Sequence, residues 1–229
     1  MTRPVSEEGV ADPLTSFISR SLRAEVSDVS EEIIQDTTEA EIDRVSFTQG
    51  DLRRSLIVKR VPPHASLEVK LLPHLSRKTD RVPVVYARGI PPETVPAWPW
   101  LLIEDLLDAP EADGLEAIVR AKVAVERAVA ADGPALVALG VPRIARRGPL
   151  AGWPEVLVHG GLSTRTAVRA ERGVVLTEWR QASLGSGLTD VVRLAAGAGV
   201  PARALAELYA EEAKLALSDE ALDAAVDLL

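Results

Sequence analysis

The sequence contains no cysteine, and this absence removes several kinds of chemistry at once. Disulfide bridges, thiolate metal sites and cysteine nucleophiles are excluded, while the redox compartment stays open. Long apolar runs are also missing, because no stretch approaches the roughly 18 uninterrupted apolar residues of a membrane span. Residues 1–13 are polar and acidic, without the apolar core of a signal peptide, so we expect a cytoplasmic protein.

Positive charge is scarce as well. Acidic residues outnumber basic ones by 34 to 26, which gives a net charge of −8 at pH 7. Nucleic acids and anionic membrane surfaces select for lysine and arginine, so we expect neither as a main partner. With 229 residues, of which 47% are hydrophobic, the chain has an ordinary globular composition and room for one two-lobed domain or two small ones.

The motifs of several common enzyme classes are missing too. The sequence has neither a P-loop nor a dinucleotide-binding fingerprint. His64 and His74 lie ten residues apart with no further ligand beside them, so we do not expect a zinc site. The basic cluster of Arg143, Arg146 and Arg147 has two interpretations, a solvated loop, which is the commoner case, or an anion site.

The first half of the chain has the pattern of a small sheet with two helices. Residues 12–13, Asp-Pro, are a helix-start signal, and residues 49–51, Gln-Gly-Asp, are a hairpin-turn signal. We predict helices over residues 13–24 and 66–75, and strands over residues 31–35, 41–48, 53–61, 82–86 and 100–103.

The second half changes to helices after a linker-like segment at residues 106–114. We predict helices over residues 115–129, 188–196, 201–217 and 219–228. The last two either close a core or provide a face for a homodimer. Strands first and helices later favour an α+β fold. We divide it into a flexible tail at residues 1–12, a sheet-rich part at residues 13–105 and a helical part at residues 106–229.

One segment carries a specific resemblance. Residues 156–168 read Val-Leu-Val-His-Gly-Gly-Leu-Ser-Thr-Arg-Thr-Ala-Val, and the apolar run at residues 174–176 leads to Glu178 and Trp179. This pattern resembles the aminoglycoside phosphotransferase and choline kinase-like family, whose loop H-G-D-x-x-x-x-N precedes a hairpin and an apolar strand ending in D-W or D-F. The resemblance covers roughly residues 14–196. It implies a protein kinase-like, two-lobed fold, with a small antiparallel-sheet N-lobe and a mainly helical C-lobe.

In that family a strand lysine contacts the phosphates of ATP and is held by a helix glutamate. The resemblance assigns these roles to Lys59, which ends an apolar strand, and to Glu68 on the following helix. The alternative is a lysine at a strand end with an unrelated surface glutamate. The segment from Leu101 to Leu106 resembles the hinge whose backbone receives adenine, so Glu104 and Leu106 are implied cofactor contacts.

His159 and Asp190 match two framework positions of the family. There, a loop histidine and an acid on the next helix brace the loop without taking part in the reaction. An interpretation that ignores the family is nearly the same, a buried histidine held by hydrogen bonds. We therefore expect a structural role for both residues.

The reactive positions of the family are altered. Gly161 stands where the catalytic aspartate accepts the proton of the substrate hydroxyl, and glycine has no group for that task. Ser163 is a weak candidate for the same role, because its hydroxyl is a poor base. Thr166 replaces the magnesium-binding asparagine. Glu178 replaces the metal-binding aspartate and keeps a carboxylate, which hard cations accept.

Glycine is missing from residues 10–49, the segment in which a phosphate cradle would lie. Such cradles need glycine because its small size lets backbone N–H groups approach the anion. The turn expected between the first two strands instead carries Asp36, Glu39 and Glu41. Their carboxylates repel a triphosphate unless Mg²⁺ or Lys59 intervenes.

The altered site supports two hypotheses. The first is a pseudokinase with a binding or regulatory role, without a required cofactor, that recognises a small molecule or a protein which the sequence does not identify. The second is an active, divergent ATP-dependent phosphotransferase acting on a small-molecule hydroxyl, with ATP and Mg²⁺ as cofactors. The loss of several groups of one site favours the first. The second stays open because phosphoryl transfer depends mainly on positioning and electrostatics.

Overall fold

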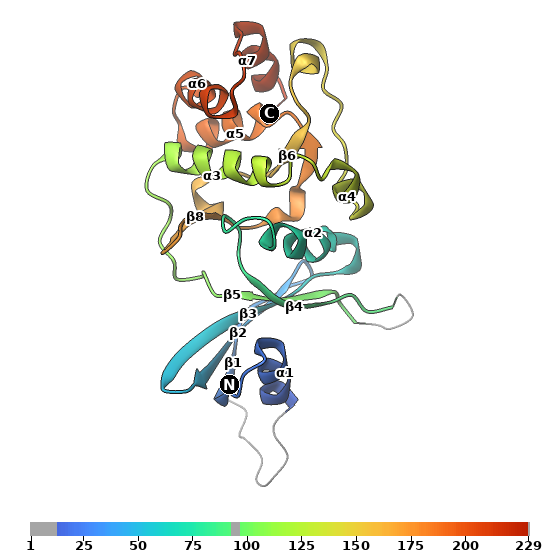
Figure 1. The fold of residues 1–229 in the computed structure, drawn as a ribbon, viewed down its shortest axis with the longest axis vertical. Helices are drawn as coiled ribbons and strands as arrows, with labels where there is room; N and C mark the ends of the chain where they lie inside the picture. Colours follow the sequence, from blue (N-terminus) through green and yellow to red (C-terminus); the bar gives the residue numbers. More distant parts are fainter. Residues whose placement is uncertain (1–12, 93–96, 229) are drawn as a thin grey trace.

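The computed structural model describes residues 13–92 and 97–228. The chain forms a sheet-rich N-lobe and a helical C-lobe stacked one on the other (Figure 1). This arrangement confirms the expected α+β, kinase-like architecture. The predicted tail at residues 1–12 lies outside the described residues. None of the described helices is long and apolar enough to cross a membrane.

The N-lobe is built on one antiparallel sheet with the strand order β1-β2-β3-β5-β4. Its strands are β1 (Ser27–Asp36), β2 (Glu41–Gln49), β3 (Leu52–Arg60), β4 (Val85–Gly89) and β5 (Trp100–Glu104). β2 and β3 form the predicted hairpin around Gly50. The φ of Gly50 is +59°, a conformation that glycine adopts without strain.

Two strands differ in position from the sequence prediction. β4 begins at Val85, three residues later than predicted, because Val82 is buried in the core and Pro83 has no amide hydrogen for a strand ladder. β1 begins at Ser27 and not at residue 31. Nearly all of its residues are exposed, so it lacks the apolar alternation that would reveal its full length.

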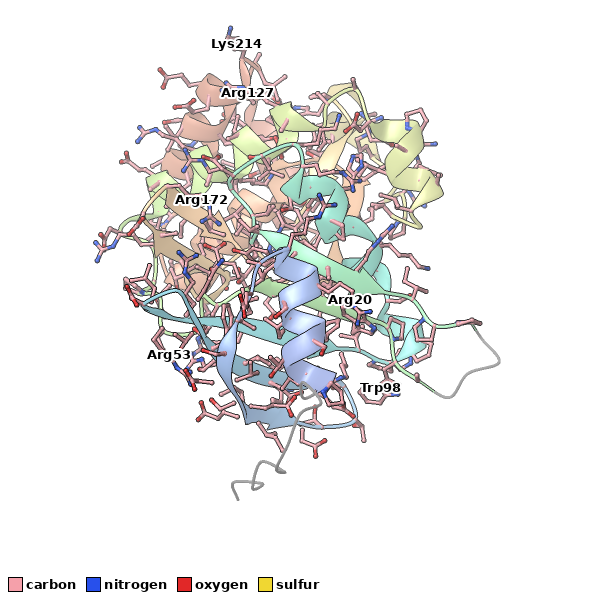
Figure 2. All side chains as sticks on the ribbon, turned by 60° about the horizontal axis from the view of Figure 1, so that its bottom comes forward. Arg20, Arg53, Trp98, Arg127, Arg172 and Lys214 are labelled. Carbon is pink, nitrogen blue, oxygen red and sulfur yellow. The ribbon has the colours of Figure 1, made fainter. Side chains whose placement is uncertain are left out.

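Helix α1 (Pro13–Leu22) covers the face of the sheet that is turned away from the C-lobe (Figure 2). Ile18 of this helix is fully buried among side chains of β2, β3 and β5. Phe17 meets Trp100 of β5 edge to face, with the ring centroids 5.2 Å apart. The N-lobe therefore has an apolar core of its own on this face.

Helix α2 (Leu67–Ser76) covers the opposite face of the sheet, and the strand lysine points to this face. Successive side chains of a strand point to opposite faces. Leu56 and Val58 of β3 pack beneath α1. Lys59 is therefore directed to the other face, where it meets Glu68 of α2.

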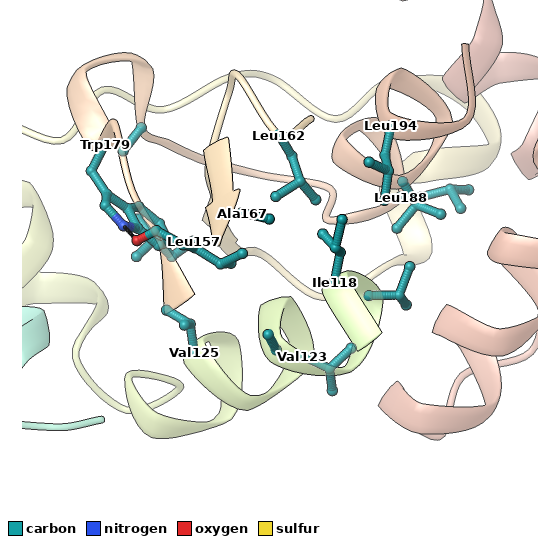
Figure 3. Packing of buried hydrophobic residues seen from close by; sticks show 14 of the residues in the cluster. Ile118, Val123, Val125, Leu157, Leu162, Ala167, Trp179, Leu188 and Leu194 are labelled. Carbon is teal, nitrogen blue, oxygen red and sulfur yellow. Dashed lines mark hydrogen bonds between the residues drawn. The ribbon is translucent and has the colours of Figure 1, made fainter. Parts of the chain in front are cut away.

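The C-lobe packs its helices around two small strand pairs. Its helices are α3 (Leu115–Ala128), α4 (Gly133–Ala138), α5 (Leu188–Ala198), α6 (Ala202–Ala213) and α7 (Asp219–Val226). The pairs are β6 (Val156–Val158) with β9 (Ser183–Gly185), and β7 (Ala167–Ala170) with β8 (Gly173–Leu176). The segment between β6 and β7, residues 159–166, is called the loop below. Ile118 of α3, Leu162 of the loop and Leu188 of α5 share one core, which fixes the loop to the helices (Figure 3).

Two helices of the C-lobe depart from the prediction. α4 is absent from it, because six residues are too few to show a helical period. α6 ends at Ala213, four residues before the predicted end, where Lys214 turns the chain with a φ of +58°.

The two lobes are also joined by an arginine of the β7–β8 turn. Arg172 forms a bidentate pair with Glu104 at the end of β5, with N–O distances of 2.7 and 2.5 Å. Its Nε donates to the carbonyl oxygen of Asp80 at 2.7 Å. Arg81 in turn donates to the carbonyl oxygen of Arg172. Planar, two-point pairs of this kind fix geometry more strongly than single contacts.

We expect the Ile18→Ala variant to lose about 2–5 kcal/mol of unfolding free energy, because it leaves a cavity between α1 and the sheet. The matched variant Ile33→Ala changes an isoleucine of β1 that is 69% exposed, and it should cost less than about 1 kcal/mol. Chemical denaturation of both variants measures the difference. Equal losses would contradict the docking of α1 on the sheet.

Candidate functional site

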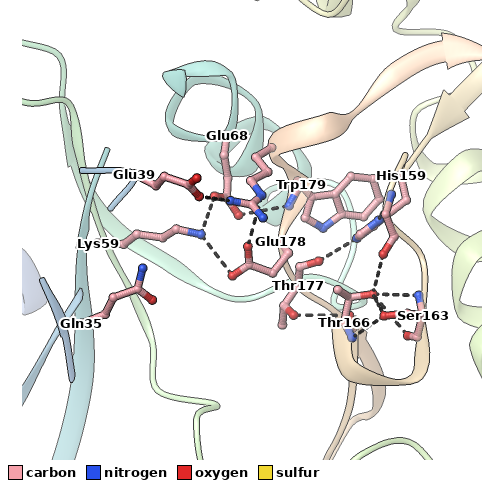
Figure 4. A network of polar contacts seen from close by, with 12 residues as sticks. Gln35, Glu39, Lys59, Glu68, His159, Ser163, Thr166, Thr177, Glu178 and Trp179 are labelled. Atoms are coloured by element: carbon pink, nitrogen blue, oxygen red, sulfur yellow. Dashed lines mark hydrogen bonds and ion pairs between the residues drawn. The ribbon is translucent and has the colours of Figure 1, made fainter. Parts of the chain in front are cut away.

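A buried ion pair lies where the two lobes meet. Lys59 Nζ is 2.7 Å from Glu68 Oε2 and 3.3 Å from Glu178 Oε1 (Figure 4). Lys59 and Glu68 are each more than nine-tenths buried, whereas the Glu178 side chain is half-buried. The structure thus brings together three predicted site residues from β3, from α2 and from the segment after β8. Their contact with a nucleotide or a metal stays a prediction.

The charge of Lys59 is fixed by its neighbours. Burial by itself lowers the pKa of Lys59, but the carboxylates of Glu68 and Glu178 outweigh it, and the pKa lies above its ordinary value. Lys59 is therefore a cation at neutral pH. Since it already lies between two carboxylates, an incoming phosphate has to displace Glu178 or bring a cation of its own.

Glu178 has a left-handed backbone conformation, with φ +65° and ψ +54°. This conformation is uncommon for a residue with a Cβ, and it persists where the surroundings impose it, often at functional sites. The next residue is anchored on both sides. Trp179 N donates to Glu68 Oε1 at 3.1 Å, and its indole Nε1 donates to Leu176 O at 2.8 Å. These anchors direct the Glu178 carboxylate toward Lys59.

Asp190 of α5 holds the loop that carries the family resemblance. Its carboxylate is fully buried and accepts hydrogen bonds from His159 N at 2.6 Å and from Gly160 N at 2.9 Å. Arg193, one turn further along α5, donates to Gly160 O. Helix α5 therefore sets the position of the loop backbone.

Both ring nitrogens of His159 are engaged within the protein. Nε2 lies 2.6 Å from the carbonyl oxygen of Thr177, and Nδ1 accepts from Gly161 N at 3.2 Å. A carbonyl only accepts and an amide only donates, so the imidazole is neutral with its proton on Nε2. Burial lowers the pKa of His159, which agrees with a neutral ring. The ring also packs against Trp179, with the centroids 4.6 Å apart.

The two glycines of the loop have different requirements. Gly160 has a φ of +83°, and an added Cβ would lie 2.2 Å from the carbonyl oxygen of Gln181, so only glycine fits. Gly161 is not in the left-handed region, and an added Cβ would lie 3.4 Å from Gln181 Oε1, an ordinary contact. The backbone therefore has room for a side chain at position 161, and the sequence supplies none.

Ser163 and Thr166 hold each other in place. Ser163 N donates to Thr166 Oγ1 at 2.9 Å, and Thr166 N donates to Ser163 Oγ at 3.3 Å. The two form a capping box on the short 3₁₀ helix Thr164–Thr166. Thr166 Oγ1 also lies 3.1 Å from Gly161 O. Both hydroxyls thus shape the loop, and the base role of Ser163 and the metal role of Thr166 stay predictions.

The predicted hinge contacts lie apart from this cluster. The Glu104 carboxylate is bound to Arg172, and Leu106 O accepts from Ala109 N at 3.1 Å in a turn. Neither Glu104 nor Leu106 lines the cavity at Lys59. Their contact with adenine stays a prediction.

The cavity at Lys59 has a volume of about 520 Å³ and is rich in charge. Three carboxylates line it, from Glu39, Glu68 and Glu178, together with the cations of Lys59 and Arg180. Arg180 lies 3.6 Å from Glu39 and 4.0 Å from Glu178. In the described part of the chain, no group of three or more His, Cys, Asp or Glu side chains is arranged to hold a metal ion.

Sequence reasoning missed Arg180, although its place directly after Glu178 and Trp179 was a usable signal. It also missed a buried network behind the loop. There, Lys122 contacts Glu126 and lies 3.7 Å from Asp190, and the hydroxyl of Tyr209 donates to Glu126 at 3.0 Å.

Burial lowers the pKa of Lys122 to about 8, while Asp190 opposes that shift. A lysine and a glutamate four residues apart on an apolar helix face were the available signal for this network. The network supports the carboxylate that holds the loop.

Comparison with solved structures finds this fold in small-molecule phosphotransferases. Macrolide 2′-phosphotransferase MphH from Brachybacterium faecium is similar over 95% of this chain and 88% of its own, with 13% identity and a TM-score of 0.60. Spectinomycin phosphotransferase, in complex with ADP and spectinomycin, is similar over 93% and 82%, with 10% identity and a TM-score of 0.60. The chain therefore has the kinase-like fold of these phosphotransferases. No model of a protein family and no curated protein matches the sequence.

We expect Gly160→Ala and Gly161→Ala to differ sharply in stability. The first forces a Cβ into the left-handed region and against the backbone of Gln181, which should cost more than about 2 kcal/mol. The second places a Cβ in ordinary contact, so its unfolding free energy should stay within about 1 kcal/mol of the unmodified protein. Urea denaturation measures both, and a destabilised Gly161→Ala would show that position 161 cannot take a side chain.

Acidification should weaken the fold through His159. Because its pKa in the folded protein lies below the ordinary value of 6.5, the unfolded chain takes up a proton that the folded protein does not. The unfolding free energy should therefore fall below about pH 6.5, by up to about 1.4 kcal/mol per pH unit. His159→Gln lacks this component and should show a shallower slope, whereas His64→Gln, at an exposed histidine, should not. Equal slopes in all three proteins would contradict a neutral, buried His159.

Proposed function

We propose that the protein is a pseudokinase, in which the fold of small-molecule phosphotransferases serves a binding or regulatory role in place of phosphoryl transfer. One observation carries the proposal. At Gly161 the backbone has room for a side chain that the sequence lacks, and the neighbouring group is the Gln181 amide, which cannot accept a proton as a base does. The position at which the related loop carries its base is therefore without one.

Three further features of the site support this proposal. The hydroxyl of Thr166 is engaged with the loop through Ser163 N and Gly161 O. The Glu178 carboxylate is paired with Lys59. Glu39, at the turn between β1 and β2, brings a further negative charge to the cavity in which phosphates would lie. Because the groups of a catalytic site act as a unit, losses in several of them are not made good by the rest.

A second candidate function is an ATP-dependent phosphotransferase that acts on a small-molecule hydroxyl. The observation in its favour is the left-handed Glu178, whose carboxylate is directed into the cleft beside the Lys59–Glu68 pair. This constellation fits a role in which Glu178 holds Mg²⁺ and Lys59 holds phosphates. A structural relative is described in complex with ADP, which agrees with nucleotide binding in this fold.

Thermal unfolding with millimolar ATP, in the presence and absence of Mg²⁺, separates the two candidates. For a pseudokinase we expect no magnesium-dependent rise in Tm, because the positive charge of Lys59 is already balanced by Glu68 and Glu178 and Thr166 is engaged within the loop. A nucleotide whose Kd is a hundredfold lower than the concentration used would add about 2.7 kcal/mol to the unfolding free energy, which is readily detected. A clear rise with Mg·ATP would show that the cavity still takes a nucleotide, and ADP formation with a hydroxyl acceptor would then overturn the first proposal.

Two variants control this measurement. Glu178→Gln keeps the shape of the side chain and removes the charge that a metal needs. Arg165→Gln changes an exposed arginine of the same loop and should leave any nucleotide effect unchanged. If Mg·ATP stabilises the protein and only Glu178→Gln abolishes the effect, a screen of hydroxyl compounds for ADP formation tests the second candidate directly.

A further inference from the structure

A second cavity, of about 240 Å³, lies in the C-lobe beside the loop. Its walls come from residues 144–150, from β9, from the first turns of α5 and from Leu228 beyond α7. It shares none of its described lining residues with the cavity at Lys59. The wall at residues 142–144 is tied to β9, because Ile144 N donates to Leu184 O and Leu184 N donates to Pro142 O, both at 2.8 Å.

The charge of this cavity is opposite to that of the whole chain. The described residues that line it include the guanidinium groups of Arg146 and Arg193 and no carboxylate, although the protein carries a net charge of −8. Each arginine uses a nitrogen for a backbone carbonyl, Arg146 for Trp153 O and Arg193 for Gly160 O. A guanidinium group carries five N–H donors, so donors remain in both.

Two serines that line the same cavity have buried hydroxyls without a protein partner. Ser183 is 3% exposed and Ser186 is 4% exposed, and neither Oγ has a hydrogen-bond partner. A buried hydroxyl without a partner costs free energy, so it calls for a specific explanation. Thr189, which also lines the cavity, differs from them because its hydroxyl donates to Ser186 O at 2.7 Å.

We propose that this cavity binds the phosphate group of a small organic phosphate. Two guanidinium groups and two unused hydroxyl donors suit an anion whose three terminal oxygens accept hydrogen bonds in several directions. Ile144, Leu150 and Val158 provide an apolar wall for the carbon skeleton of the ligand. A volume of about 240 Å³ lies below the usual range for drug-sized ligands, so the ligand is small.

This site is independent of the proposed loss of catalysis. It uses the C-lobe cavity and not the Lys59–Glu178 cluster, so phosphate binding holds or fails whether or not the protein transfers phosphate. The arginines at residues 143–147 differ in their relation to the cavity. Arg146 lines the cavity, whereas Arg143 is exposed and lies 3.3 Å from Glu155.

Calorimetric titration of the full chain with inorganic phosphate, at an ionic strength matched with chloride, tests the proposal. We expect saturable binding that Ser186→Ala and Ser183→Ala each weaken about tenfold, because each removes one hydrogen bond to a charged group. Without phosphate, both variants should be as stable as the unmodified protein or more so, because an unpaired buried hydroxyl has been removed. A purely structural role of the serines would instead give a loss of stability with unchanged phosphate affinity.

Arginine variants provide the matched comparison. Arg146→Gln should weaken phosphate binding at least about tenfold, and Arg143→Gln, a few residues away outside the cavity, should leave it unchanged. If Arg146→Gln does not fold, the two serine variants decide the question alone.

Three outcomes would overturn the proposal. The first is no heat beyond that of the chloride control. The second is binding that Lys59→Ala abolishes while Ser186→Ala does not, which would assign the phosphate to the interlobe cavity. The third is tighter binding of acetate or citrate than of phosphate, which would assign the cavity to carboxylates.

Discussion

The buried carboxylate of Asp190 is the interaction on which the rest of the site depends. A fully buried anion is stable only when donors surround it, and here two backbone amides of the loop and the Lys122 amine are its neighbours. The loop, α5 and α3 are thereby fixed to one another. None of these contacts involves position 161. The shape of the loop is consequently maintained without any contribution from a side chain at position 161.

The cluster at Lys59 is likewise held by contacts within the protein. Glu68 uses one oxygen for Lys59 and the other for the amide of Trp179. It therefore joins β3, α2 and the segment after β8, and it does so without a ligand. The contacts that join these elements are thus all internal to the protein.

The sequence was informative wherever a pattern was local. The β2–β3 hairpin, the lysine strand, α2 and the loop framework could be predicted because each depends on turn residues, an apolar run or a motif. The start of β1 could not, because an exposed edge strand has no apolar alternation. The start of β4 depended on the burial of Val82, and the setting of Arg172 depended on Glu104, 68 positions away. Such contacts leave no trace in the local pattern.

The pair of Arg172 with Glu104 has a mechanical consequence. The chain leaves the N-lobe after β5, and the β7–β8 turn of the C-lobe contacts the end of β5 through this pair. The lobes are therefore connected twice at this point, once by the covalent chain and once by the ion pair. We expect a connection closed in this way to bend less than an open one, because bending would have to break the bidentate pair. A cleft whose width changes little would leave a ligand with little conformational entropy to lose on binding.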